Sequence, residues 1–163
     1  LGQGPLPDTP TPRETLAQEI ARQLRLTHAG ARILVAEDEP ISRDIVSHML
    51  QCAGLTVQVA SDGLQALSFA QAEAYDLILL DMQMPGLDGP AVTRALRACG
   101  ASSGAPVLAL TASAFDQDRR TCEDAGMNGF LTKPLEMGRL LTEVLRWLKA
   151  SLRITRPTSP PTS

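Results

Sequence analysis

A short run of aliphatic residues that ends in an acid constrains this chain more than any other feature. Leu77 to Leu80 are four consecutive apolar residues, and Asp81 follows them directly. An apolar run without polar alternation is typical of a central parallel strand that is covered on both faces. Open α/β sheets bind their ligands at the carboxyl ends of such strands. The pattern therefore predicts a buried strand that delivers the Asp81 carboxylate to a ligand site. The alternative is that Asp81 only starts a turn.

The rest of the chain alternates between strand and helix patterns. Strands are expected at residues 32–36, 57–60, 76–80, 106–110 and 129–132. Helices are expected after Pro40, Gly63, Pro90 and Met137, and a weaker helical pattern covers residues 116–124. The helix after Pro40 is expected to have one apolar face, made of Ile41, Ile45, Val46, Met49 and Leu50. Five alternating units predict an α/β domain, with a doubly wound parallel sheet, right-handed crossovers and helices on both faces. By position, Asp62, Asp76 and Asp88 are turn or cap residues.

The two ends of the chain differ in composition from the middle. Residues 1–10 are rich in Pro, Gly and Thr and are expected to be flexible, and a helix is expected over residues 12–27. We assign residues 1–29 to a lead and linker helix, residues 30–150 to the domain, and residues 151–163, which are rich in Pro, Ser and Thr, to a disordered tail. The apolar stripe of the first helix (Leu16, Ile20 and Leu24) needs a partner: the domain, a second copy, or an upstream domain.

Composition and charge exclude several classes of function. The chain has 163 residues and a net charge of −3, with acids and bases mixed along the sequence. One domain without direct binding to nucleic acid is therefore expected. No run approaches the roughly 20 apolar residues of a membrane span, so no direct membrane contact is expected either. Cys52, Cys99 and Cys122 lack metal-type spacing. Reduced thiols, mostly buried, in a cytoplasmic protein are the prediction.

Polar side chains follow four of the five expected strands. These are Glu37 with Asp38, then Asp81, Thr111 and Lys133. Three carboxylates that meet at one sheet edge repel one another unless a cation lies among them, and Mg²⁺ prefers such oxygen ligands. Lys133 suits a phosphoryl group or a carboxylate, and Thr111 supplies a hydroxyl donor. A site of this kind can transfer a phosphoryl group to a carboxylate nucleophile.

Four segments, taken in order, carry a family resemblance. Glu37-Asp38, the segment from Asp81 to Gly89, the segment from Leu110 to Ala112, and Lys133-Pro134 resemble the receiver domain of two-component response regulators. The resemblance runs from about residue 31 to residue 148. It implies a flavodoxin-like fold with strand order 2-1-3-4-5. The sequence around Glu37-Asp38 looks most like that of receivers attached to hybrid histidine kinases.

The resemblance also implies a metal site and a phosphoacceptor. Asp81 would accept a phosphoryl group from a phosphohistidine on a histidine kinase or a histidine phosphotransfer protein. Asp38 and Asp81 would bind Mg²⁺ directly, together with the backbone carbonyl of Gln83, and Glu37 would act through water. The isolated domain would then assist its own phosphorylation and dephosphorylation rather than act as a conventional enzyme.

Other residues would bind the phosphoryl group or move when Asp81 is phosphorylated. Lys133 would pair with one phosphoryl oxygen, and Thr111 and the Ala112 amide would bind others. The resemblance implies a cis bond between Lys133 and Pro134. Thr111 would move toward the phosphate and Phe130 would follow it inward, although Phe130 is also compatible with a plain core position. The face of the fourth domain helix, the fifth strand and the last helix would bind a partner or a second copy.

Several alternatives remain open from the sequence alone. A magnesium-dependent phosphohydrolase with an aspartyl nucleophile would share the cation, but it needs an acid two residues after Asp81, where Gln83 stands. A receiver-like interaction module without phosphorylation is the third class. For a phosphorylated receiver, we favour the C-terminal part of a hybrid kinase, which can itself be anchored in a membrane, over a stand-alone regulator. His28 and His48 are interpreted as surface histidines.

Overall fold

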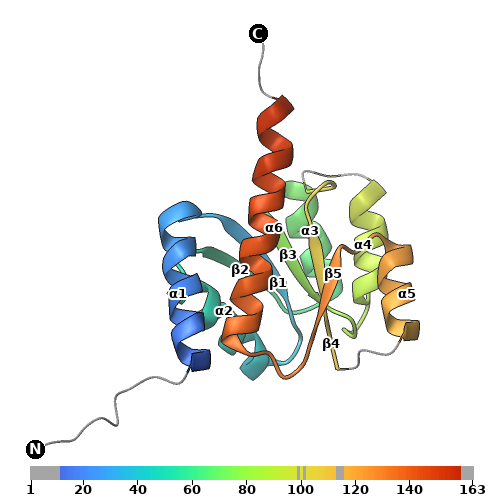
Figure 1. Cartoon of the computed structure of the whole chain (residues 1–163). Helices are drawn as coiled ribbons and strands as arrows, with labels where there is room; N and C mark the ends of the chain where they lie inside the picture. Colours follow the sequence, from blue (N-terminus) through green and yellow to red (C-terminus); the bar gives the residue numbers. More distant parts are fainter. Residues whose placement is uncertain (1–11, 99, 101, 113–115, 159–163) are drawn as a thin grey trace, which may run out of the picture.

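A computed structural model describes residues 12–98, 100, 102–112 and 116–158 (Figure 1). The expected flexible lead and the last five residues of the expected tail lie outside these residues. The elements in chain order are α1 (Pro12–Thr27), β1 (Arg32–Ala36), α2 (Pro40–Cys52), β2 (Thr56–Ala60), α3 (Gly63–Ala72), β3 (Leu77–Asp81), α4 (Gly89–Ala98), β4 (Val107–Thr111), α5 (Asp116–Ala125), β5 (Gly129–Thr132) and α6 (Met137–Thr158).

The five strands form one parallel sheet, as the alternating pattern predicts, in the order β2-β1-β3-β4-β5, as the family resemblance implies. All five residues of β3 are buried, and so are all five of β4, because helices cover both faces of the central strands. The helix starts also follow sequence signals. Asp62 caps α3 by accepting a hydrogen bond from the Gln65 amide at 2.8 Å, and Asp88 does the same for Ala91 in α4 at 2.9 Å.

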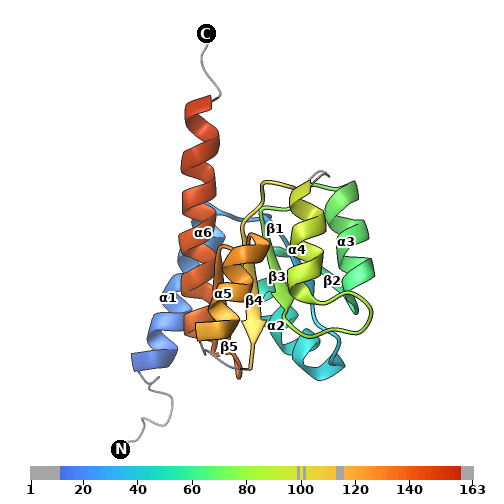
Figure 2. The same ribbon diagram turned by 90° about the vertical axis from the view of Figure 1, so that its right-hand side faces the viewer.

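Alternate residues of each strand supply two separate apolar layers. In β3, Leu77 and Leu79 join the layer under α1, α2 and α6, whereas Ile78 and Leu80 join the layer under α3, α4 and α5. This alternation is the two-residue period of a strand. Figures 1 and 2 show the resulting arrangement, in which α1 and α6 lie side by side on one face of the sheet and α3 and α4 on the other.

The apolar stripe of α1 packs on the domain itself. Of the predicted stripe, Ile20 and Leu24 are buried together with Ala17 and Ala21, whereas Leu16 is 54% exposed. The helix α1 runs along α6. At the other end of the helix, Arg25 Nη1 donates a hydrogen bond of 2.8 Å to the carbonyl of Cys52, the last residue of α2. Of the three partners considered for this stripe, the structure shows the first. In the structure α1 is therefore part of the domain rather than a free linker.

Three expectations about surface and ends are corrected. The helix α6 continues to Thr158, although a disordered tail is predicted from Ser151, because residues 151–156 contain no helix breaker and the Pro-rich composition starts only at Pro157. Of the α2 residues assigned to one apolar face, Val46 and Leu50 are buried, whereas Ile41 and Ile45 are 68% and 48% exposed.

The third correction concerns the cysteines. Cys52, the last residue of α2, is exposed, whereas Cys122 is buried as predicted. Cys99 lies outside the described residues. A separate observation concerns the helices: none of those in the described part of the chain combines the length and the apolar character that crossing a bilayer requires.

Candidate functional site

The carboxyl ends of β1, β3, β4 and β5 meet at one edge of the sheet. The register pairs Ala36 with Leu80, Asp81 with Leu110, and Thr111 with Thr132. The residue that follows each strand, or ends it, is therefore held within a few ångströms of its neighbours across the sheet. Parallel pairing alone brings together side chains that are far apart in the chain. At this edge it brings Glu37 and Asp38, which follow β1, close to Asp81, which ends β3.

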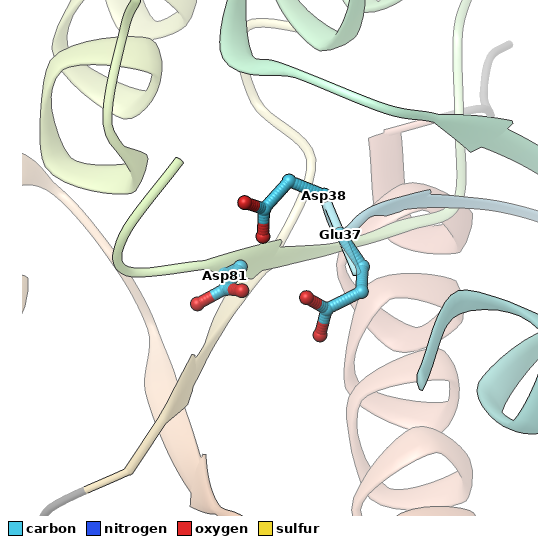
Figure 3. Close-up of side chains that lie close together, drawn as sticks. All are labelled: Glu37, Asp38 and Asp81. Carbon is cyan, nitrogen blue, oxygen red and sulfur yellow. The ribbon is translucent and has the colours of Figure 1, made fainter. Parts of the chain in front are cut away.

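The three carboxylates face a common space (Figure 3). One oxygen from each of Glu37, Asp38 and Asp81 lies within 4.8 Å of the other two. Asp38 is exposed, whereas Glu37 and Asp81 are buried. Three anions at this separation repel one another strongly, since little water screens the two buried ones. The arrangement therefore requires positive charge nearby.

Lys133 supplies part of that charge. Its Nζ lies 3.0 Å from Asp81 Oδ2 and 2.8 Å from Glu37 Oε1. Burial alone would lower the pKa of Lys133, but the ion pairs with Glu37 and Asp81 raise it, so the ammonium stays charged. Burial raises the pKa of Glu37, and the nearby Asp81 raises it further, against the opposing effect of Lys133. One ammonium is thus shared between two carboxylates and leaves the cluster with a net negative charge.

The loop after β3 is tied down on both sides of Asp81. Asp81 Oδ1 accepts a hydrogen bond from the Gln83 amide at 3.2 Å, and the Met82 amide donates to the Leu110 carbonyl at 2.9 Å. Gly89 allows the loop to close, because a Cβ at this position would lie 2.6 Å from the Asp81 carbonyl oxygen. The carboxylate of Asp81 is therefore presented by a rigid turn.

The carboxylates and Lys133 line an open cleft together with the end of β4. Thr111 is buried at the last position of β4, and Ala112 follows it. The Lys133 amide donates a hydrogen bond of 2.7 Å to the Thr111 carbonyl, which holds the end of β5 against β4. Gln83 also lines the cleft. The site therefore brings together every residue for which the sequence predicts a role in metal or phosphate binding.

Comparisons with known proteins identify the family. The model of the response regulator receiver domain matches residues 33–145. The chain belongs to this family. It is a receiver domain of two-component phosphorelay signalling, and the five-stranded sheet order is the flavodoxin-like order that this family shows.

Two relatives illustrate the similarity. The receiver is 37% identical over 135 residues to the sensor protein GacS of Pseudomonas syringae pv. syringae. The aligned region covers 81% of this chain and 15% of GacS. It is 40% identical to the receiver domain of the sensor histidine kinase PA1611 of Pseudomonas aeruginosa PAO1, with a TM-score of 0.70 over 74% of this chain and 99% of that one. That crystal structure contains a magnesium ion coordinated in the active site cleft. The chain spans only about a fifth or less of the first curated relatives it matches.

The acidic cluster of this receiver has the properties of a site for a hard cation. Its potential ligands are all oxygens, and two of its three acids, Glu37 and Asp81, are buried. The single ammonium of Lys133 balances only part of the charge of three carboxylates, and a divalent cation nearby would balance the rest. The cluster of Glu37, Asp38 and Asp81 can therefore bind a metal.

Phe130 is half-buried rather than fully enclosed. Its ring packs partly against the layer under α3, α4 and α5, and the guanidinium of Arg119 in α5 lies 4.9 Å from the ring centre. The half-exposed ring agrees with a side chain that has room to move, but also with an ordinary edge position. The peptide bond between Lys133 and Pro134 is cis, as the resemblance implies.

The sequence analysis missed the residues that hold the acidic loop in place. Glu39 caps α2, since its Oε1 accepts a hydrogen bond from the Ser42 amide at 2.8 Å. Arg43 reaches back to the carbonyl of Glu37. An acid followed by Pro40 at the first helical position was a usable signal for the cap. No local pattern indicates the contact of Arg43.

Proposed function

We propose that Asp81 accepts a phosphoryl group from a phosphohistidine on a histidine kinase or a histidine phosphotransfer protein. The observation that carries this proposal is the position of the Asp81 carboxylate, which lies at the end of β3 within 4.8 Å of two further acids and 3.0 Å from Lys133. A carboxylate oxygen of Asp81 attacks the phosphorus, the bond from phosphorus to the imidazole nitrogen breaks, and the imidazole leaves. The product is an aspartyl phosphate on the receiver.

The residues of the cleft mainly position and neutralise the transferred group. Lys133 already contacts Asp81, so its ammonium can move to a phosphoryl oxygen over a short distance. Thr111 and Ala112 also line the cleft, and the Thr111 hydroxyl and the Ala112 amide would bind the other phosphoryl oxygens. These contacts act on charge and orientation, which dominate catalysis of phosphoryl transfer.

We further propose that the cation of this site is Mg²⁺. Asp38, Asp81 and the backbone carbonyl of Gln83 would be direct ligands, and Glu37 would act through water. Bound Mg²⁺ would neutralise negative charge on the carboxylates and on the incoming phosphoryl group. The oxygen-only ligand set and the negative charge that Lys133 leaves unbalanced on the three acids support this assignment, as does the magnesium ion in the PA1611 receiver.

Phosphorylation is proposed to change the face formed by α5, β5 and α6. Thr111 and Phe130 would be the switch residues, since Thr111 lines the cleft at the end of β4 and Phe130 lies in β5, which pairs with β4. This face would then bind a protein partner or a second copy of the receiver. We favour a hybrid histidine kinase, with this receiver in the cytoplasm, as the parent protein over a stand-alone regulator, since the sensor kinases GacS and PA1611 contain similar domains.

The test of the phosphoacceptor is intact-mass measurement after incubation with acetyl phosphate, with and without Mg²⁺. The parent should gain one phosphoryl group only when Mg²⁺ is present, and Asp81→Asn should gain none. Asp62→Asn is the matched control, because Asp62 lies outside the cleft and asparagine also caps helices well. A parent protein that gains no mass and binds no beryllofluoride would contradict the proposal and favour an interaction module.

A further inference from the structure

The acidic loop between β1 and α2 is closed by a guanidinium from the first turns of the helix. Arg43 Nη1 donates a hydrogen bond of 3.1 Å to the carbonyl oxygen of Glu37, six residues earlier in the chain. The Arg43 amide also donates to the Glu39 carbonyl at 2.9 Å. The side chain of Arg43 is half-buried, so its contact with the loop is partly protected from water. Arg43 therefore joins the helix to the loop that carries two of the three acids.

Two further hydrogen bonds complete a closed ring around Asp38. The Glu39 amide donates to Glu37 Oε2 at 3.3 Å, and the Ser42 amide donates to Glu39 Oε1 at 2.8 Å. The chain is thus held on both sides of Asp38 through groups that belong to its neighbours. Each of these bonds is local, and among the residues that the structure describes the bond from Arg43 is the one that ties the carbonyl of Glu37 to the helix.

The carbonyl of Glu37 matters because it belongs to the same planar peptide unit as the Asp38 nitrogen. When that plane is held, the nitrogen and Cα of Asp38 are fixed, and the bond from the Glu39 amide to Glu37 Oε2 limits the remaining rotation about the N–Cα bond, which sets the direction of Cβ. Asp38 is the exposed member of the acidic cluster, so packing restrains its side chain less than that of Glu37 or Asp81. A backbone restraint is therefore an effective way to keep its carboxylate directed at the site.

We propose that Arg43 is a positioning residue for the metal site, which orients Asp38 through the Glu37 carbonyl. The inference rests on the proposed binding of Mg²⁺ by Asp38 and Asp81. Since the guanidinium donates to a carbonyl rather than to a carboxylate, it adds order without taking an oxygen that the cation needs. Groups that orient metal ligands in this way typically change metal affinity by about 10- to 100-fold when they are removed.

The test compares Mg²⁺ binding in the parent, Arg43→Gln and Arg43→Lys. The dissociation constant is measured by titration of the unphosphorylated protein, followed by the amide resonances of Asp38 and Glu39. Arg43→Gln should raise it about tenfold. Arg43→Lys should restore most of the affinity, because an ammonium can still donate one hydrogen bond to the Glu37 carbonyl. Arg94→Gln, the same substitution at an exposed position of α4, is the control and should leave the affinity unchanged.

Two more measurements separate positioning from a general loss of stability. In the Mg²⁺-free protein, the Asp38 and Glu39 amides of Arg43→Gln should exchange with solvent faster than in the parent, while amides of β3 are unchanged. With acetyl phosphate, the loss of rate in Arg43→Gln should disappear at saturating Mg²⁺. An unchanged Mg²⁺ dissociation constant in a folded Arg43→Gln would overturn the inference. A parent that binds Mg²⁺ but is never phosphorylated would instead contradict the proposed function and leave the role of Arg43 standing.

Discussion

Truncation of Leu24 in α1 should destabilise the whole domain, although α1 precedes the part of the chain that the family model covers. Leu24 has no exposed surface and belongs to the apolar layer under α1, α2 and α6. Replacing a fully buried leucine with alanine costs about 2–5 kcal/mol, so we expect Leu24→Ala to lower the free energy of unfolding by about 3 kcal/mol. For a domain of this size, the melting temperature should fall by roughly 10 °C.

Urea unfolding measures this loss directly. The chain contains a single tryptophan, Trp147, which lies in α6, the helix along which α1 packs. Its fluorescence therefore reports on the relevant layer. Leu26→Ala is the matched control, since Leu26 lies in the same helix and is 70% exposed. The control should stay within about 0.5 kcal/mol of the parent. If Leu24→Ala is as stable as Leu26→Ala, then α1 does not pack on the domain in solution and the reasoning is wrong.

Three further predictions concern single side chains. Arg97→Gln should lower the free energy of unfolding, measured by urea titration, by about 3 kcal/mol. The reason is that Arg97 donates five hydrogen bonds of 2.6–3.1 Å to the loops before β4 and β5. A loss below about 1 kcal/mol would contradict this prediction. Burial lowers the pKa of His28 in the folded protein from its ordinary value of 6.5. As the pH falls, the unfolded chain therefore takes up a proton at this histidine before the folded protein does, and the free energy of unfolding should decrease below about pH 6.5. The decrease should be smaller in His28→Gln. Urea midpoints that depend on pH equally in the parent and in His28→Gln would contradict this prediction. Lys133→Gln should still bind Mg²⁺ but accept a phosphoryl group from acetyl phosphate at least about 100-fold more slowly than the parent. A time course of intact-mass spectra measures this rate. A rate close to that of the parent would rule out the proposed role of Lys133.

Much of the fold and of the site was predictable because both follow from local patterns. The run from Leu77 to Leu80 indicates a strand buried on both faces, and parallel strands place the residues after them at one edge. This is why Glu37, Asp81 and Lys133 come together as predicted, within 3.0 Å for each contact of Lys133. The metal and phosphate roles of these residues remain predictions, and the experiments above test them.

Helix surfaces were predictable only in part. A helical pattern shows that an apolar face exists, but it does not show how wide a stripe the sheet covers. In α2 the covered stripe contains Val46 and Leu50, and Ile41 and Ile45 remain exposed. The partner of α1 and the extension of α6 were undecided or wrong for the same reason, because propensity and composition do not report contacts between distant segments.

The amino-acid sequence by itself determined the order of strands and helices, the family, and the set of polar residues at the strand ends. These depend on the two- and 3.6-residue periods and on residues adjacent in the chain. Only the tertiary structure decided that α1 packs along α6, that Lys133 is shared between Glu37 and Asp81, and that Arg43 holds the Glu37 carbonyl. The physical reason is that these contacts depend on the distance and direction between side chains and backbone groups, which are set only when the elements pack together.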